Sequence, residues 1–334
     1  MSTRAAELTT LRVGGEIATL VEVLSEQELI DAITKFPDAL ILGDGSNLLF
    51  AGAMSTQPVI KVSTRGISHE VDACSGATWT VSAGENWDDF VLATIEAGCA
   101  GLETLSGIPG TVGAAPIQNI GAYGSELNSS VARVRVFDRK SREVRTYAAA
   151  DCGFGYRTSL FKKEVDRFVI LEVIFQLRVG DMSNEVTYPE LATELNINIG
   201  ERAPVDAVRS AVLSIRTRKG MVLSSNDTDT WSAGSFFVNP TLPPSQIPAG
   251  APAWEQEDGR VKTSAAWLIE KSGTSKGERF GNAAVSSKHV LALTNTGSAT
   301  SEEIIEAART IQNRVFKMFG ITLQPEVRIV GAEL

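Results

Sequence analysis

Hydrophobic and polar positions along the chain follow two spacings, which predict short strands alternating with helices. Three segments repeat apolar residues at helical spacing and carry end signals. The first begins after Ser25 and ends before Pro37, and the second follows the cap Asn86. The third begins at Thr300 and ends at Gly320. These segments are expected to be amphipathic helices with one buried face.

Strands are predicted where apolar residues form short runs or alternate with polar ones. Residues 17–23, 39–42, 48–50, 79–84, 131–137, 143–147 and 168–177 fit this description. Strict alternation over 321–329 predicts a last strand, with Glu326 and Arg328 on its polar face. The apolar run at 168–175 is broken by Glu172 and is far shorter than the roughly 20 residues of a membrane span. The pattern as a whole indicates an α+β protein.

Composition excludes several classes of protein. The 334 residues predict two or three domains, and 43 % hydrophobic with 21 % charged residues is typical of globular chains. A net charge of −9 argues against a general nucleic-acid or membrane-surface binder. Cys74, Cys99 and Cys152 lie too far apart for a disulfide framework or a zinc site. With no signal-peptide pattern at the N-terminus, we expect a cytoplasmic protein.

A glycine turn follows the predicted strand at 39–42. It consists of Gly43, Asp44, Gly45, Ser46 and Asn47. Such a turn lets backbone N–H groups approach a phosphate closely. The third glycine of a dinucleotide fingerprint is missing, and a strand rather than a helix follows, so a Rossmann site is disfavoured. An ordinary hairpin turn remains the alternative.

A second glycine-rich segment covers residues 101–125. It holds six glycines, whereas the chain average of 29 in 334 predicts about two. Pro109 and Pro116 stiffen it, and Ala114 and Ala115 keep it thin. Such a loop can wrap its amides around a pyrophosphate. The alternative is a surface Ω-loop without a ligand.

Three polar side chains are candidates for chemistry. Arg157 follows an aromatic residue and can bind a carboxylate in bidentate fashion, although a solvated arginine is the commoner outcome. Ser235 lies among small residues and two phenylalanines, where its hydroxyl can donate a proton or simply occupy a turn. Glu326 precedes Arg328 by two positions, a spacing that usually has a structural role.

Together and in this order, these segments resemble the UDP-N-acetylenolpyruvoylglucosamine reductase family, also called UDP-N-acetylmuramate dehydrogenases, which are flavoenzymes of bacterial peptidoglycan precursor synthesis. The resemblance runs from about Leu11 to Gly331. Its most specific part is the stretch at 101–124, and the runs at 155–157, 233–240 and 324–328 match the family's active-site motifs. The segment around Tyr188 resembles the longer of the family's two subtypes.

The resemblance implies a two-lobed FAD-binding fold of the vanillyl-alcohol-oxidase type and an α+β substrate-binding domain. The expected parts are residues 1–70, 71–222 and 223–320, with a C-terminal strand over 321–334 that can return to the first lobe. The family binds FAD non-covalently and uses NADPH as co-substrate, and we expect no metal-binding residues. The residues expected to bind FAD are Gly43, Asp44, Gly45, Ser46, Asn47, Gly84, Gly107, Ile108, Pro109, Gly110, Gly113, Ala114, Gln118, Asn119, Gly121, Ala122, Tyr123 and Gly124.

The resemblance also implies a reaction. Hydride passes from flavin N5 to C3 of the enolpyruvyl group of UDP-N-acetylglucosamine enolpyruvate. Ser235 matches the residue that protonates C2, while Arg157 and Glu326 match those that bind or polarise the carboxylate. Expected contacts to the diphosphate and uridine are Tyr188, Lys219, Asn239, Lys262 and Arg328.

Some positions depart from the family pattern. Lys288 lies in a run that replaces an expected glutamine, which leaves one substrate contact open, and Val238 stands where a lysine often occurs. One alternative is another FAD-dependent sugar or alcohol oxidoreductase of the same fold. An alternative from a different class is a UDP-sugar-binding protein without turnover. We expect a monomer with a small-molecule substrate and with no nucleic-acid or membrane partner.

Overall fold

The computed structural model describes residues 3–54, 56–72 and 76–334, so Cys74 lies outside the described residues. The chain forms two compact units, each discontinuous in sequence. Unit 1 comprises residues 1–17, 45–54 and 219–334, and unit 2 comprises residues 18–44 and 55–218. The four-part division expected from the sequence stays a prediction.

Unit 2 begins with a small parallel sheet. Its strands are β3 (Leu20–Val23), β6 (Val59–Val62) and β4 (Leu40–Leu42), in the order β3-β6-β4. Helix α1 (Glu26–Lys35) connects β3 to β4, and the Ser25 side chain accepts a hydrogen bond from the Glu28 N–H. This capped helix confirms the sequence prediction.

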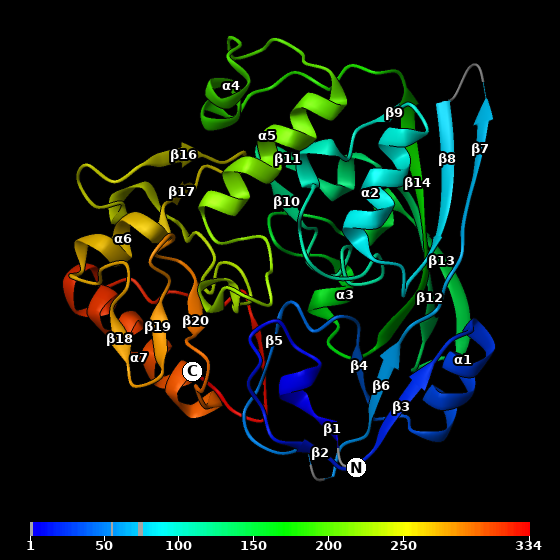
Figure 1. Cartoon of the computed structure of the whole chain (residues 1–334), viewed down its shortest axis with the longest axis horizontal. Helices are drawn as coiled ribbons and strands as arrows, with labels where there is room; N and C mark the ends of the chain where they lie inside the picture. The colour runs from blue at the N-terminus through cyan, green and yellow to red at the C-terminus, as the bar shows by residue number, and fades with distance from the viewer. Residues whose placement is uncertain (1–2, 55, 73–75) are drawn as a thin grey trace. The chain divides into compact units, whose positions relative to one another are not determined.

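A larger antiparallel sheet forms the rest of the unit 2 core. Its order is β13 (Glu143–Ala148), β12 (Val131–Asp138), β14 (Phe168–Val179), β8 (Gly76–Ser82) and β7 (Ile67–Asp72), and β9 (Cys99–Ala100) also pairs with β14. These strands run side by side in Figure 1. Helix α2 (Trp87–Glu96) contacts the sheet through Trp87 and Phe90, whose rings lie 6.2 and 4.8 Å from that of Phe175. Aromatic packing therefore fixes the start of α2.

Shorter elements complete unit 2. They are the hairpin of β10 (Gly121–Ala122) and β11 (Ser125–Glu126), and helices α3 (Leu160–Lys163), α4 (Pro189–Leu195) and α5 (Val205–Arg218). Helices α4 and α5 share a buried apolar cluster that includes Leu191, Val208, Val212 and Ile215. This cluster supports the positions of Tyr188, which precedes α4, and of the charged face of α5.

Unit 1 combines short strands with two helices. The pairs are β1 (Thr3–Arg4) with β2 (Glu16–Ile17), and β5 (Leu48–Phe50) with β21 (Arg328–Val330). Two three-stranded sheets follow. The first has the order β15 (Thr241–Leu242), β17 (Val261–Thr263) and β16 (Ala253–Glu255). The second has the order β18 (Arg279–Phe280), β19 (Ala283–Val285) and β20 (Leu293–Asn295). The helices are α6 (Ala265–Lys271) and α7 (Ser301–Phe319). A capping box between Thr300 and Glu303 begins α7, and Gly320 ends it at φ 70°, as predicted.

Two strand predictions need correction. The predicted strand at 17–23 is interrupted at 18–19, because Ile17 ends β2 of unit 1 and Leu20 begins β3 of unit 2. The predicted strand at 321–329 is wrong for residues 321–327, since β21 comprises only Arg328–Val330. Residues 321–324 alternate between buried and exposed, but Pro325 and Glu326 are both half-buried. Pro325 has no N–H to donate and makes only an isolated bridge with Phe237. The mixture of sheets and helices confirms the α+β class.

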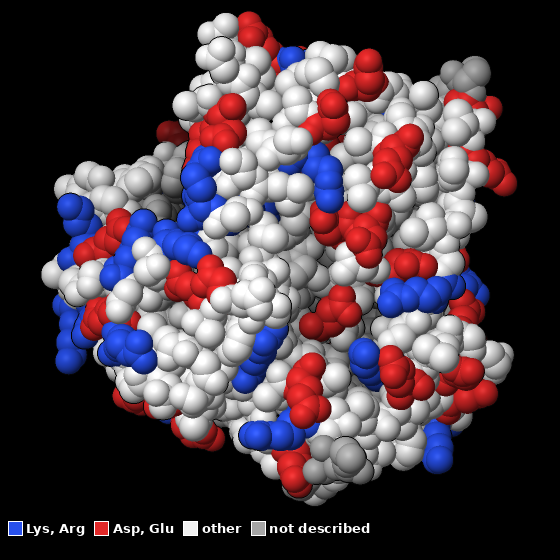
Figure 2. Space-filling model, viewed as in Figure 1, with Lys and Arg blue, Asp and Glu red and all other residues white. Residues whose placement is uncertain are grey.

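Charge and hydropathy of the folded chain add two observations. None of the helices among the described residues is both long and apolar enough to cross a membrane. In Figure 2, acidic and basic side chains are interspersed over the visible face without a continuous basic field.

Candidate active site

Three expected FAD-binding segments meet in unit 2. The Gly113 N–H donates to the Ala83 carbonyl at 2.8 Å, and the Val112 N–H donates to the Glu85 carbonyl at 2.9 Å. A Cβ added at Gly43 would lie 2.5 Å from Thr111 Oγ1, and one at Gly113 would lie 2.6 Å from Ala83 Cβ. The glycine turn after β4, the end of β8 and the glycine-rich loop therefore approach one another closely, which requires glycine at positions 43 and 113.

An ion pair holds the glycine-rich loop at Gly107. Asp88, in the first turn of α2, accepts the Gly107 N–H at 2.6 Å. The same carboxylate receives two hydrogen bonds from Arg209 of α5, at 2.7 and 2.8 Å. Burial raises the pKa of Asp88, but the hydrogen bonds from Arg209 and Gly107 outweigh burial, so the pKa lies below its usual value. The loop is therefore anchored by an ionised carboxylate.

We predict that Asp88→Ala lowers both stability and FAD affinity. Loss of these bonds to a charged group is expected to cost about 2 kcal/mol at neutral pH. Because the folded-state pKa is lowered, this contribution is present above the usual carboxyl pKa and is lost as the pH falls through the folded-state pKa. Urea unfolding of wild type and variant at neutral and acidic pH should therefore give curves that converge in acid. Glu194→Ala, which removes an exposed ion pair with Arg218, is the control and should change stability much less.

Two expected ligand-binding tyrosines contact each other in unit 2. The rings of Tyr123 and Tyr188 meet edge to face, with centroids 5.5 Å apart. Tyr123 has φ 50°, and burial raises the pKa of its hydroxyl to about 12. Its hydroxyl hydrogen-bonds Arg216 of α5, a residue that the sequence analysis missed. The sequence feature that could have pointed to Arg216 is the pair of basic residues, Arg216 and Arg218, in the last turn of α5.

Arg157 lies beside the glycine-rich loop. Its guanidinium donates to the Gly121 carbonyl at 2.6 Å, and its own carbonyl accepts from Lys162 Nζ at 3.0 Å. The turn that carries Arg157 is held by Asn119, whose buried amide donates to the Gly155 carbonyl at 3.1 Å and to Glu126 Oε2 at 2.7 Å. The structure thus brings Arg157 next to the expected FAD-binding residues Asn119 and Gly121.

Ser235 and Glu326 lie on paired segments of unit 1. The Glu326 N–H donates to the Phe236 carbonyl at 2.8 Å, and the Val238 N–H donates to the Gln324 carbonyl at 3.0 Å. On its other side, Ser235 forms an antiparallel bridge with Ala292. The rings of Phe236 and Phe237 are buried at 1 % and 2 % exposure. The main chain at Ser235 is therefore fixed from two sides while the two rings anchor the segment in the core.

Asn47 connects the glycine turn to Glu326. Its side-chain amide donates to the Glu326 carbonyl at 3.2 Å, and its carbonyl accepts the Arg328 N–H at 3.0 Å. Thr10 holds the turn through bonds to the Gly45 and Ser46 carbonyls at 3.3 and 3.4 Å. Unit 1 thus brings together four residues of the expected list, Asn47, Ser235, Glu326 and Arg328.

The other expected substrate contacts in unit 1 lie on separate elements. Asn239 contacts the start of α6, since its Oδ1 accepts the N–H of Ala265, the first residue of the helix, at 2.9 Å. Lys262 is on the central strand β17, where it pairs with Thr241 on one side and Trp254 on the other. Lys219 directly follows α5.

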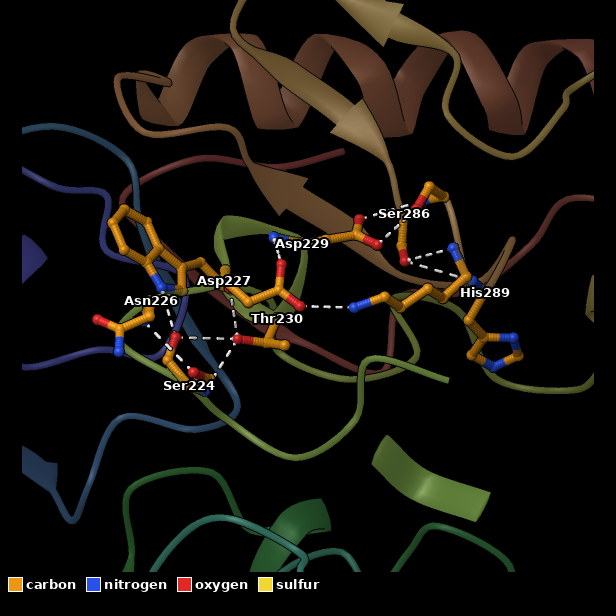
Figure 3. Close-up of polar contacts among 10 residues, drawn as sticks. Ser224, Asn226, Asp227, Asp229, Thr230, Ser286 and His289 are labelled. Atoms are coloured by element: carbon orange, nitrogen blue, oxygen red, sulfur yellow. Dashed lines mark hydrogen bonds and ion pairs between the residues drawn. The ribbon is translucent and has the colours of Figure 1, made fainter. Parts of the chain in front are cut away.

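Position 288 is part of a polar network in unit 1 (Figure 3). Lys288 Nζ contacts Asp227 Oδ2 at 2.5 Å, and this hydrogen bond lowers the pKa of the Asp227 carboxyl. The residue that replaces the expected glutamine is therefore committed to an ion pair within the protein.

Comparison with known proteins identifies the family. Residues 226–330 match the family described as UDP-N-acetylenolpyruvoylglucosamine reductase, C-terminal domain, and residues 17–147 match the FAD binding domain family. A UDP-N-acetylenolpyruvoylglucosamine reductase from Cutibacterium acnes is 49 % identical, over 98 % of this chain and 89 % of that protein. The chain belongs to the UDP-N-acetylenolpyruvoylglucosamine reductase family. The family resemblance inferred from the sequence is confirmed.

Two further relatives of this reductase family cover nearly the whole chain. The Streptomyces avermitilis protein of the same name is 44 % identical over 98 % of this chain and 94 % of its own length. The crystal structure of UDP-N-acetylenolpyruvylglucosamine reductase from Thermus caldophilus superposes with a TM-score of 0.68 at 26 % identity and covers 98 % of both chains.

FAD is the cofactor of this reductase family member, as predicted. The described residues fit it, because Gly43, Gly84 and Gly113 lie where a Cβ would collide with neighbouring atoms. These glycines lie within residues 17–147, which match the FAD binding domain, and they let the turn after β4, residue 84 and the glycine-rich loop pack closely together.

Proposed function

We propose that this oxidoreductase reduces UDP-N-acetylglucosamine enolpyruvate to UDP-N-acetylmuramate, with NADPH as the reductant, in peptidoglycan precursor synthesis. The observation that carries the proposal is the pairing of the Ser235 and Glu326 segments in a chain that also has the FAD-binding segments. We propose a cytoplasmic location and a monomeric state, in keeping with the small-molecule substrate.

Each candidate residue has a role in the proposed reaction. FAD, held by the glycine-rich segments, would supply the hydride chemistry, from flavin N5 to C3 of the enolpyruvyl group, after reduction by NADPH. Negative charge then develops at C2 and on the conjugated carboxylate. Ser235 donates the proton to C2, Arg157 provides positive charge to the carboxylate, and Glu326 polarises the same group. The proton on Ser235 must be replaced from solvent after each turnover.

Substrate recognition is proposed to rest on cationic and aromatic side chains. The diphosphate requires positive charge, which Lys219, Lys262 and Arg328 provide. Tyr188 and Asn239 offer hydrogen bonds to the diphosphate and uridine. Asn239 already accepts a hydrogen bond from the Ala265 N–H, so its amide N–H groups face the ligand in this proposal.

The proposed substrate is tested by matched UDP-sugars. NADPH oxidation should require the enolpyruvyl sugar, and the product should be two mass units heavier than that substrate. UDP-N-acetylglucosamine, which lacks the enolpyruvyl group, should support no turnover. Oxygen-dependent NADPH oxidation at the same rate with either sugar would favour another FAD-dependent sugar or alcohol oxidoreductase. Binding of the enolpyruvyl sugar without product would favour a non-catalytic UDP-sugar-binding protein.

A further inference from the structure

Two loops of unit 1 are joined by the polar network of Figure 3. One loop precedes Ser235 and covers residues 224–231, and the other is the turn at 286–289 after β19. Both oxygens of the Asp229 carboxylate contact Ser287, one accepting its N–H at 3.0 Å and the other accepting its hydroxyl at 2.8 Å. Asp229 therefore connects the two loops directly, beside the contact of Lys288 Nζ with Asp227 Oδ2.

The residues around Asp229 hold it in place. Asp227 Oδ1 accepts the Asp229 N–H at 3.0 Å, and Asp227 Oδ2 contacts Lys288 Nζ. The hydroxyl of Thr230 donates toward the carbonyls of Ser224 and Asp227, at 3.1 and 2.7 Å. These hydrogen bonds hold the loop at 224–231 in one conformation.

The turn at 286–289 is equally constrained. The buried hydroxyl of Ser286 accepts the N–H groups of Lys288 and His289, at 3.1 and 3.3 Å. The Ser286 N–H donates to the Ala292 carbonyl at 2.9 Å, and the Ala292 N–H donates to the His289 carbonyl at 3.0 Å. A displacement at Ser287 is therefore transmitted to Ala292.

Ala292 and its neighbour Leu291 hold the Ser235 segment on the side opposite Glu326. The Leu291 carbonyl accepts the Phe236 N–H at 2.8 Å, and Ala292 bridges Ser235. The Asn295 N–H donates to the carbonyl of Trp231 at 3.0 Å, which fixes the other end of the same segment. Residues 231–236 thus pair with residues 291–295. Asp229, two residues before Trp231, adds the hydrogen bonds to Ser287.

We propose that Asp229 is a positioning residue for Ser235, acting through its two hydrogen bonds to Ser287. The inference rests on the proposed function, in which Ser235 protonates C2. A proton donor must lie within hydrogen-bond reach of the atom that it protonates, and a misplacement of roughly 1 Å can cost about 10²-fold in rate. Without Asp229, the turn at 286–289 loses both hydrogen bonds at Ser287, and only the contact of Lys288 with Asp227 still joins this turn to the loop that precedes Ser235.

The two half-reactions of the holoenzyme test this proposal. In Asp229→Ala, reoxidation of reduced flavin by the enolpyruvyl sugar should slow by about 10- to 100-fold and show a larger solvent deuterium isotope effect. Flavin reduction by NADPH needs no proton from Ser235 and should stay within about twofold of wild type. Amide exchange at Phe236 should become faster, because its bond to Leu291 is less protected.

A conservative variant separates hydrogen bonding from charge. In Asp229→Asn, the amide oxygen can accept the Ser287 N–H while the amide nitrogen donates to the Ser287 hydroxyl. This variant should therefore recover to within about threefold of wild type. Glu278→Ala, which removes a 2.7 Å ion pair with Arg314 elsewhere in unit 1, is the matched control and should leave both half-reactions unchanged.

Several results would overturn the proposal. They are an Asp229→Ala reoxidation rate equal to that of the control, equal slowing of both half-reactions, and failure of Asp229→Asn to recover. If Asp229→Ala does not fold, Ser287→Ala decides, since it removes one bond at an exposed residue and should slow reoxidation by about 3- to 10-fold. If the reduced flavin of the wild-type protein is never reoxidised by the enolpyruvyl sugar, the proposed function is refuted instead. Amide exchange at Phe236 would then still test whether Asp229 supports the Ser235 segment.

Discussion

Replacing Ser235 by alanine is expected to leave flavin reduction by NADPH intact while slowing product formation by roughly 10²- to 10⁴-fold, the range typical of a lost general acid. The main chain at this position is held by the bridge to Ala292 and by the bonds of Phe236 to Leu291 and Glu326. Alanine keeps all of these contacts. The variant should therefore fold and retain FAD, and stopped-flow absorbance should show rapid bleaching followed by very slow reoxidation.

Ser275→Ala is the control for this experiment, since it removes a hydroxyl from an exposed serine of the same unit. It should match wild type in both half-reactions. Reoxidation of Ser235→Ala at the wild-type rate would show that another group protonates C2.

Gly84→Val is expected to abolish FAD retention. A Cβ at Gly84 would lie 2.4 Å from the Thr64 nitrogen and 2.6 Å from the Thr64 carbonyl oxygen, both main-chain atoms that cannot rotate away. The turn at 83–85, which follows β8, would have to move, and it carries the carbonyls that receive the N–H groups of Val112 and Gly113. We expect the melting temperature to fall, FAD to be absent after purification, and FAD affinity to drop by at least about 10²-fold, with overpacking and lost main-chain bonds both contributing.

Gly98→Ala provides the matched glycine control in unit 2. Its φ is 71°, so alanine is strained by roughly 1–2 kcal/mol, but no atom lies within 4 Å of the added Cβ. This variant should lose some stability and keep its FAD. Purified Gly84→Val with one FAD per chain would contradict the role given to the close approach of these loops.

The helices could be predicted because their end signals are local. Ser25, Asn86 and Thr300 each accept a hydrogen bond from the N–H three residues later, and each was recognisable from sequence alone. The buried faces of these helices follow from apolar spacing in the same short windows.

Strand pairing was harder to predict, because periodicity reports burial rather than hydrogen bonding. Residues 321–327 alternate as a strand does, yet they pair with 236–238 only through isolated bonds. The chain finds a regular partner only at Arg328, where β5 is available. No feature of the sequence near Pro325 predicts that β5 is the partner strand.

The arrangement of the candidate site depends on contacts between distant residues. Asn47 reaches the Glu326 carbonyl across 279 positions, and Asp229 reaches Ser287 across 58. Neither contact has a local signature, since both use ordinary polar residues in loops. Motif resemblance selected Ser235 and Glu326, but the residues that support them required the structure.

The measurement that tests the central claim most directly is an anaerobic flavin spectrum of the purified protein. One equivalent of NADPH should bleach the oxidised flavin bands, and UDP-N-acetylglucosamine enolpyruvate should then restore them with formation of UDP-N-acetylmuramate. Recovery only on admitting air would contradict the proposed substrate. A protein that neither copurifies with FAD nor binds it on reconstitution would contradict the account as a whole.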